Sequence, residues 1–142
     1  MDTTNLVAMA MHVKSDTAAL VVVATLHLIA QGIHSYSHTV AGVENSLPEL
    51  LFILFVVTVL PWIAIVVGWR FDVGKGAALF ALAMVASFLF SYSLHFVIEG
   101  PDLHSRVVEQ YRSVFFHSAA GLALLEFSGF VLGLYVLVRK LG

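Results

Sequence analysis

The stretch His27-Leu-Ile-Ala-Gln-Gly-Ile-His-Ser-Tyr-Ser-His38 lies in the second half of a long apolar segment. If this segment is an α-helix, successive residues are about 100° apart around its axis. Four polar side chains then fall within one narrow arc: His27, Gln31, His34 and His38. Such side chains are costly to place in hydrocarbon and normally face the interior of a helix bundle or a wet cavity. The stretch therefore predicts a membrane helix with one face packed against other helices.

The composition of the whole chain points to the same environment. Of its 142 residues, 60% are hydrophobic and 11% are charged, whereas soluble domains average about 25% charged residues. Four apolar segments reach the length of roughly 20 residues that crosses about 30 Å of hydrocarbon: 17–41, 47–69, 76–98 and 114–138. We expect an all-α integral membrane protein with a single membrane domain (1–142), folded as an up-down bundle of four transmembrane helices. Residues 100–113 would form a short extracytoplasmic segment.

Several classes of site are excluded or not indicated. The chain contains no cysteine, which excludes disulfides, iron–sulfur clusters and thiolate metal sites. No basic cluster is present, so we expect no nucleic-acid partner. The apolar run that begins near Thr17 is longer than the core of a secretory signal peptide, so we expect no cleaved leader. No nucleophile–base pair is recognisable, so no catalytic residue is assigned, and whether the chain is itself an enzyme stays open.

Local signals indicate how the second segment begins and bends. Ser46-Leu-Pro-Glu49 has the pattern of a capping box with proline in the first turn. Pro61 lies near the centre of the segment and is expected to kink it, which membrane helices tolerate because neighbours satisfy the freed backbone groups. The connection 42–45 is short, so the first two helices are expected to be antiparallel neighbours.

The distribution of Lys and Arg predicts the orientation. One side of the predicted bundle carries more of these residues than the other. They are Lys14, Arg70, Lys75, Arg139 and Lys140 on one side, against Arg106 and Arg112 on the other. We expect a multi-pass protein of the cell (inner, cytoplasmic) membrane with both termini in the cytoplasm.

Polar side chains collect where three helix ends are expected to meet at the outer face. His34 and His38 are four residues apart on the first helix, and His95 and Glu99 have the same spacing at the end of the third. His117 lies in the first turn of the fourth helix. Imidazole and carboxylate ligands without sulfur suit zinc, copper(II), iron or nickel. We predict a transition-metal site (copper, zinc or iron) formed by these five residues at the outer end of the bundle.

The same histidines allow other interpretations. A b-type haem needs two imidazoles from different helices, one on each face of the ring, and His34 with His95 is the first axial pair to test. The chain would then be an electron-transfer subunit. In a third interpretation there is no cofactor, the polar stripe bonds to partner helices or conducts protons, and single histidines near helix ends lie at the membrane interface.

Glu126 lies near the middle of the fourth apolar segment, hence near the midplane of a membrane, and His27 reaches a similar depth on the first. We expect His27, Gln31 and Glu126 to form a proton path that leads to the outer site. The alternative is a protonated Glu126 that bonds to a partner helix. Gly129-Phe-Val-Leu-Gly133 is a pattern that permits close helix approach and indicates a homo-oligomer or a larger complex.

These observations favour one function over the others. We predict a small subunit of a redox or metal-dependent membrane complex, with an oxidoreductase as the preferred setting because redox metals work at this depth. Its partners would be the lipid bilayer and other membrane subunits or further copies of the chain.

Overall fold

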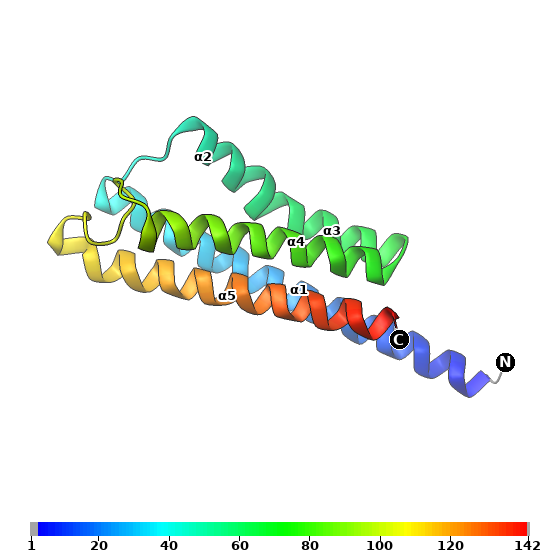
Figure 1. Ribbon diagram of the computed structural model, residues 1–142. Coiled ribbons are helices and arrows are strands. Elements are labelled where there is room, and N and C mark those ends of the chain that lie inside the picture. The colour runs from blue at the N-terminus through cyan, green and yellow to red at the C-terminus, as the bar shows by residue number, and fades with distance from the viewer. Residues whose placement is uncertain (1–2, 142) are drawn as a thin grey trace.

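The computed structural model describes residues 3–141, with side chains from Ser15 onward, and within that range it consists of helices and loops without strands (Figure 1). Four helices are long and apolar enough to cross a membrane: Ser15–Ala41, Leu47–Arg70, Val73–Val97 and Glu109–Leu141. The expectation of an all-helical chain with four such helices is confirmed. The position of Lys14, one of the charges that predict orientation, lies outside the described side chains.

The four spans contain seven helical elements. They are α1 (Thr3–Ala41), α2 (Leu47–Phe52), the π-helical segment η1 (Ile53–Val59), α3 (Leu60–Arg70), α4 (Val73–Tyr92), the π-helical segment η2 (Ser93–Val97) and α5 (Glu109–Leu141). α1 packs against α5 and α3, and α4 packs against the same two helices, so the bundle closes on itself. We call the end that carries the loops 42–46 and 98–108 the distal end, because both termini lie towards the opposite end (Figure 1).

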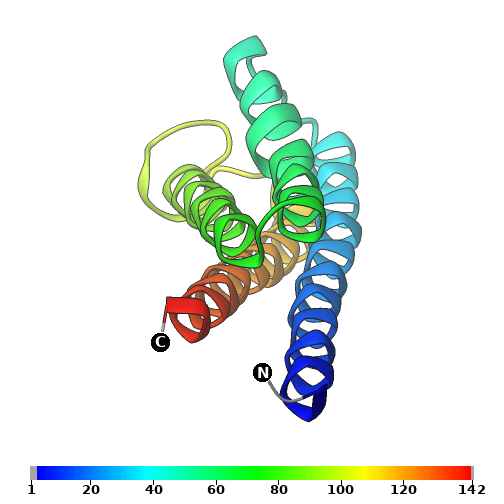
Figure 2. The same cartoon turned by 90° about the vertical axis from the view of Figure 1, so that its right-hand side faces the viewer.

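The second span is the least regular. The capping box is present, with Oε2 of Glu49 accepting a hydrogen bond from the backbone N–H of Ser46 at 2.6 Å. The irregularity near Pro61 takes the form of a π-helical segment, η1, directly before it. Proline lacks an N–H and its ring clashes with the carbonyl four residues earlier, and a wider turn removes that clash. α2, which precedes η1 in the chain, leans away from the rest of the bundle (Figures 1 and 2).

The first and fourth helices begin earlier in the chain than the sequence predicts. α1 begins at Thr3 rather than near residue 17, and α5 begins at Glu109 rather than near 114. The loop between the third and fourth spans is therefore shorter than expected, at 98–108. Because α5 starts early, Tyr111 lies on this helix and packs with Val107 and Phe115 under the loop.

Two kinds of contact hold the half of the bundle near the termini. Leu20 and Ala24 of α1 pack with Phe80 and Met84 of α4 in an apolar core. On α5, a Cβ atom added to Gly129 would meet the side chain of Met84, and one added to Gly133 would meet Ala81. The small-xxx-small pattern therefore mediates contact between α5 and α4 of the same chain.

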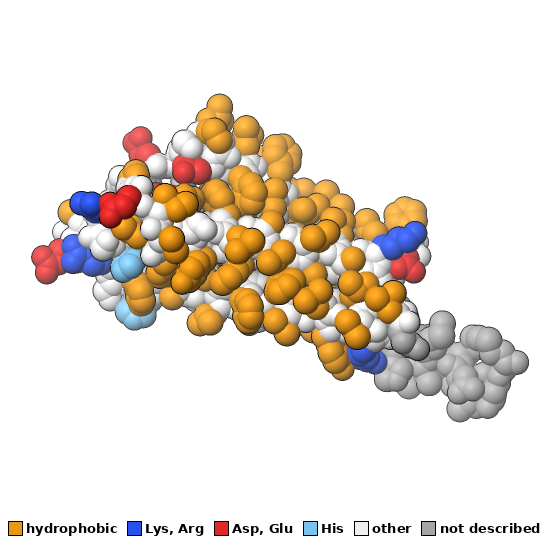
Figure 3. Space-filling model, viewed as in Figure 1, with side chains coloured by type: hydrophobic (Ala, Val, Ile, Leu, Met, Phe, Trp, Pro, Cys, Tyr) orange, Lys and Arg blue, Asp and Glu red, His pale blue; other side chains and the backbone are white. Residues whose placement is uncertain are grey.

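The surface has the distribution expected in a bilayer. Hydrophobic side chains cover the flank of the bundle, and charged side chains gather at its two ends (Figure 3). At the end near the termini, the buried carboxylate of Asp16 forms ion pairs with Arg139 and Lys140, each at 3.1 Å. These pairs tie α1 to the last turn of α5.

Candidate metal centre

His34, His38 and His95 meet at the distal end, and all three are buried. Nε2 of His34 lies 2.9 Å from Nε2 of His95 and 3.2 Å from Nε2 of His38. One nitrogen from each ring lies within 4.8 Å of the other two. Two ligands at about 2.0–2.1 Å from a tetrahedral zinc ion lie roughly 3.3 Å from each other. The three imidazoles therefore have the spacing of ligands around one ion.

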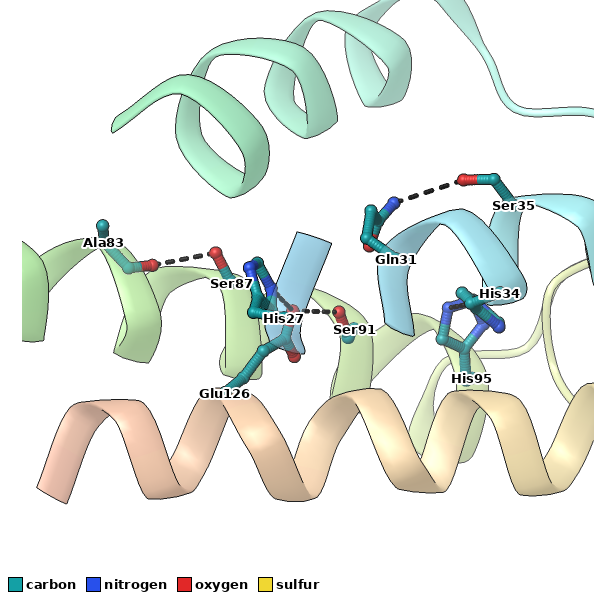
Figure 4. Close-up of polar contacts among 9 residues, drawn as sticks. All are labelled: His27, Gln31, His34, Ser35, Ala83, Ser87, Ser91, His95 and Glu126. Carbon is teal, nitrogen blue, oxygen red and sulfur yellow. Dashed lines mark hydrogen bonds and ion pairs between the residues drawn. The ribbon is translucent and has the colours of Figure 1, made fainter. Parts of the chain in front are cut away.

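The loop 98–108 determines which nitrogen of His95 carries the proton. Nδ1 of His95 lies 3.1 Å from the backbone carbonyl oxygen of Asp102. A carbonyl oxygen only accepts hydrogen bonds, so Nδ1 must be the protonated nitrogen of the neutral ring. Nε2 of His95 then has a free lone pair, and it is this atom that faces His34 (Figure 4).

Two serines lie beside Nδ1 of His34. Ser37 donates to the backbone carbonyl of His34 at 2.7 Å, and Ser118 lies 3.0 Å from both the carbonyl oxygen of Phe115 and Oγ of Ser37. Oγ of Ser118 also lies 3.0 Å from Nδ1 of His34. When Ser118 donates to one of these oxygens and accepts the Nδ1–H of His34, Nε2 of His34 carries a lone pair rather than a proton.

In this tautomer two nitrogen lone pairs face each other at 2.9 Å in a buried site, whereas in the other tautomer Nε2–H of His34 donates to Nε2 of His95. Two facing lone pairs repel each other unless a positive charge lies between them or beside them. A shared proton or a metal ion supplies that charge. Nε2 of His38 lies 3.2 Å from Nε2 of His34 and provides a third imidazole. Two nitrogens are enough to share a proton, whereas a metal ion binds all three, so the third imidazole favours a metal ion.

The three rings are tightly packed, and one aromatic side chain contacts all of them. The ring of Phe115 lies against all three imidazoles, with centroid distances of 5.3, 4.8 and 5.4 Å to His34, His38 and His95. The cavity beside the histidines has a volume of about 20 Å³, enough for roughly one water molecule. A haem between His34 and His95 needs its iron and porphyrin plane between two nitrogens that here are in contact. The geometry therefore favours a single small ion over haem.

Two residues of the predicted ligand set lie outside the cluster. Glu99 is exposed, and its Oε2 accepts a hydrogen bond from Arg106 at 2.7 Å. His117 is exposed on α5, and its Nδ1 lies 2.7 Å from the carbonyl oxygen of Ser113 in the preceding turn. The third helix becomes π-helical over Ser93–Val97 and ends there, so Glu99 does not continue the face that carries His95.

The loop brings in a residue that helical spacing does not indicate. Asp102 is 5% exposed and lines the same cavity as the three histidines. Burial, reinforced by the charge of Glu49, raises the pKa of Asp102 to about 6. His104 holds the loop in place, because its backbone N–H and its Nδ1 both lie within hydrogen-bond distance of the carbonyl oxygen of His95, at 3.1 and 2.9 Å. Helical periodicity gives no signal for loop residues such as Asp102 and His104. Ser37, in contrast, lies three residues after His34 on the same helix, so its place beside this histidine can be predicted from their spacing.

Two of the three predicted proton-path residues, His27 and Glu126, meet deeper in the bundle, whereas Gln31 donates to Ser35 at 3.5 Å. Nε2 of His27 lies 3.4 Å from Oε1 of Glu126, and Ser91 donates to the same oxygen at 3.1 Å (Figure 4). Glu126 is completely buried within the chain. Gln31 and Ser91 line the cavity of the three histidines, so they lie between the two polar groups.

Comparison with known proteins adds no relative to these observations. No family model, curated protein or solved structure matches the chain. The assignment of the site therefore depends on the arrangement of the side chains at the distal end.

Proposed function

We propose that this chain is a membrane-embedded metal-binding subunit in which His34, His38 and His95 hold one transition metal ion. The observation that carries the proposal is the convergence of three buried imidazoles, with Nε2 of His34 2.9 Å from Nε2 of His95 and 3.2 Å from Nε2 of His38. At the opposite ring nitrogens, Nδ1 of His95 donates to the carbonyl oxygen of Asp102, and Nδ1 of His34 lies 3.0 Å from Oγ of Ser118. Such partners are what orient the histidine ligands of metal sites.

Three imidazoles suit zinc, copper(II), iron or nickel, whereas ions that prefer sulfur ligands, such as copper(I), bind less well to such a site. Three protein ligands leave a coordination position for water or another small molecule, which is the pattern of reactive metal sites rather than closed structural ones. A buried centre of this kind fits a small subunit of a redox or metal-dependent membrane complex.

The test is the metal content of detergent-solubilised protein that was never exposed to a metal-affinity column. We expect one copper, zinc or iron ion per chain and no Soret band in the visible spectrum. His38→Ala is expected to lose most of the bound metal because one of three ligands is gone. His117→Ala is the matched control, since this histidine lies on the same end of the bundle and outside the cluster.

Other outcomes discriminate between the alternatives. A Soret band that shifts on reduction would support the b-type haem interpretation instead. A folded sample with neither metal nor haem would contradict both cofactor proposals for the isolated chain. Equal metal loss in His38→Ala and His117→Ala would argue against the three-histidine site.

A second candidate function is favoured by one specific observation. Ser91 lines the cavity of the histidines and donates to Glu126, so a polar connection runs from the distal site to the buried carboxylate. Towards the termini the bundle is filled by apolar side chains such as Leu20, Phe80 and Met84. In this proposal Glu126 and His27 accept protons from the distal side and release them to the same side, and the chain serves as an accessory subunit with a proton path that ends at Glu126. Loss of proton uptake in Glu126→Gln, measured with an indicator dye, would support it.

A further inference from the structure

A second cavity lies next to the three histidines at the distal end, and its volume is about 200 Å³. We call it the acidic vestibule. Four carboxylate residues line it, from three different segments of the chain: Glu44, Glu49, Glu99 and Asp102. Arg106 is paired with Glu99 at 2.7 Å, which leaves an excess of negative charge. Glu44 and Glu99 are exposed, so the vestibule opens to the aqueous phase.

Asp102 connects the vestibule with the metal centre. It lines both the vestibule and the cavity of His34, His38 and His95. The side chain is 5% exposed, and within the described part of the chain its Oδ1 has no hydrogen-bond partner. A buried carboxylate oxygen without a partner is costly. A cation that passes between the two cavities would provide the missing partner.

Most of the other groups around the metal centre belong to the bundle interior. Phe115 of α5 is completely buried against the three imidazoles, and Ala41 and Val107 pack with it. The polar residues Gln31, Ser35 and Ser91 line the small cavity from within the helices. Asn45 and Asp102 are the residues of this lining that come from the distal loops, so the way to water leads past them.

We propose that a hydrated divalent cation reaches the three histidines through the acidic vestibule, with Asp102 as the carboxylate that passes it from water to the imidazoles. This inference rests on the proposed metal-binding function and adds the path and the side from which the site is loaded. Carboxylates suit an ion that is still hydrated, and imidazoles suit the final site of a transition metal. The negative charges around the mouth raise the local concentration of cations.

The experiment follows the loading of metal-free protein in detergent with Co²⁺, whose visible absorption reports binding to imidazoles. Stopped-flow mixing gives the association rate, and displacement by excess chelator gives the dissociation rate. A residue that only passes the ion lowers both rates by the same factor, since the same path is used in both directions, and leaves the affinity unchanged. A permanent ligand instead raises the dissociation rate when it is removed.

Asp102→Asn is expected to slow association and dissociation together, by roughly tenfold, because the carboxylate lowers the barrier between the vestibule and the histidines in both directions. Glu44→Gln changes an exposed residue at the mouth, where folding is not at risk, and is expected to slow association several-fold at low salt and less at high salt. Glu109→Gln is the matched control, because it removes the same charge from the same end of the bundle outside the vestibule.

Rates that change in Asp102→Asn and Glu44→Gln but not in Glu109→Gln support the path. Unchanged rates in both vestibule variants, or equal effects in the control, overturn it while leaving metal binding itself intact. Faster dissociation of Asp102→Asn with normal association also overturns it, because Asp102 would then be a ligand. If the wild type binds no Co²⁺, the proposed metal-binding function fails and the path fails with it.

Discussion

The carboxylate of Glu126 on α5 and the imidazole of His27 on α1 meet inside the bundle, with Oε1 of Glu126 3.4 Å from Nε2 of His27. Ser91 donates to the same oxygen from α4, at 3.1 Å. One carboxylate thus joins three of the four spans at a point without access to solvent. Both features of α5 that suggested a partner chain, Glu126 and the Gly129–Gly133 pattern, are engaged within the chain instead.

The first prediction concerns the stability contributed by Glu126. Glu126→Leu leaves buried donors on His27 and Ser91 without an acceptor and is expected to destabilise the fold by about 1–3 kcal/mol. Glu126→Gln keeps a carbonyl oxygen for Ser91 and is expected to melt close to the wild type. Thermal unfolding in detergent, followed by circular dichroism, measures both. A wild-type melting temperature for Glu126→Leu would show that these contacts contribute nothing.

The second prediction compares two glycines of α5. A Cβ atom on Gly133 would lie 2.9 Å from the backbone nitrogen of Ala81, whereas one on Gly121 would meet nothing within 4 Å among the described residues. Gly133→Ala forces α4 and α5 apart and is expected to destabilise by about 1–3 kcal/mol. Gly121→Ala is expected to be neutral or stabilising by up to about 1 kcal/mol, since alanine is the better helix former. The same melting experiment decides, and equal effects of the two substitutions would contradict the close packing.

The third prediction tests how the histidines are oriented. In the metal-binding tautomer Ser118 accepts the Nδ1–H of His34 at 3.0 Å, and the other hydroxyl near this nitrogen, that of Ser37, is farther away at 3.3 Å. Ser118→Ala is expected to weaken metal binding by about 10–100-fold, the usual effect of losing a hydrogen-bond partner of a ligand. Ser113→Ala removes a hydroxyl that lies beside His117 instead and serves as the control. Competition against a chelator of known affinity measures both variants, and an unchanged affinity in Ser118→Ala would argue against the tautomer assignment.

The fourth prediction concerns pH. The pKa of Asp102 is raised from 3.8 to about 6 by burial and by Glu49. Between these values the folded chain keeps a proton that the unfolded chain has released, so stability is lost as the pH rises through the interval. Asp102→Asn has no ionisable group at this position, so its free energy of unfolding does not show this loss. In metal-free protein, the melting temperature of the wild type is therefore expected to fall relative to that of Asp102→Asn from about pH 4 to about pH 6. A constant difference between the two proteins over this range would contradict the raised pKa.

The fifth prediction is the orientation in the membrane. Because the chain has no cysteine, single cysteines report their own accessibility. We expect a membrane-impermeant maleimide to label Ser105→Cys in the distal loop of intact cells, and Lys75→Cys near the termini only after lysis. The reverse pattern would contradict the orientation predicted from Lys and Arg.

The number of apolar helices, their approximate bounds and the histidines that could share one site can be recognised from the amino-acid sequence alone. Hydrophobic segment length and helical periodicity are local properties, so the pair His34 and His38 and the apolar run 47–69 can be recognised without a structure. The capping box at Ser46 is local in the same sense. The contact between His27 and Glu126 was also foreseeable, from their similar depth on helices that are neighbours in a closed bundle.

Which polar groups meet depends on how the helices pack against one another. Glu99 has the right spacing from His95, but the helix becomes π-helical and ends before it, and its carboxylate pairs with Arg106. His117 faces outward because α5 uses the opposite face, with Glu126, for the core. Asp102 reaches the site because the loop after the third span folds back over His95, and Ser118 reaches it from a neighbouring helix that is distant in sequence. Contacts of this kind depend on how helices rotate and pack against one another, and helical spacing within a single segment carries no information about that rotation.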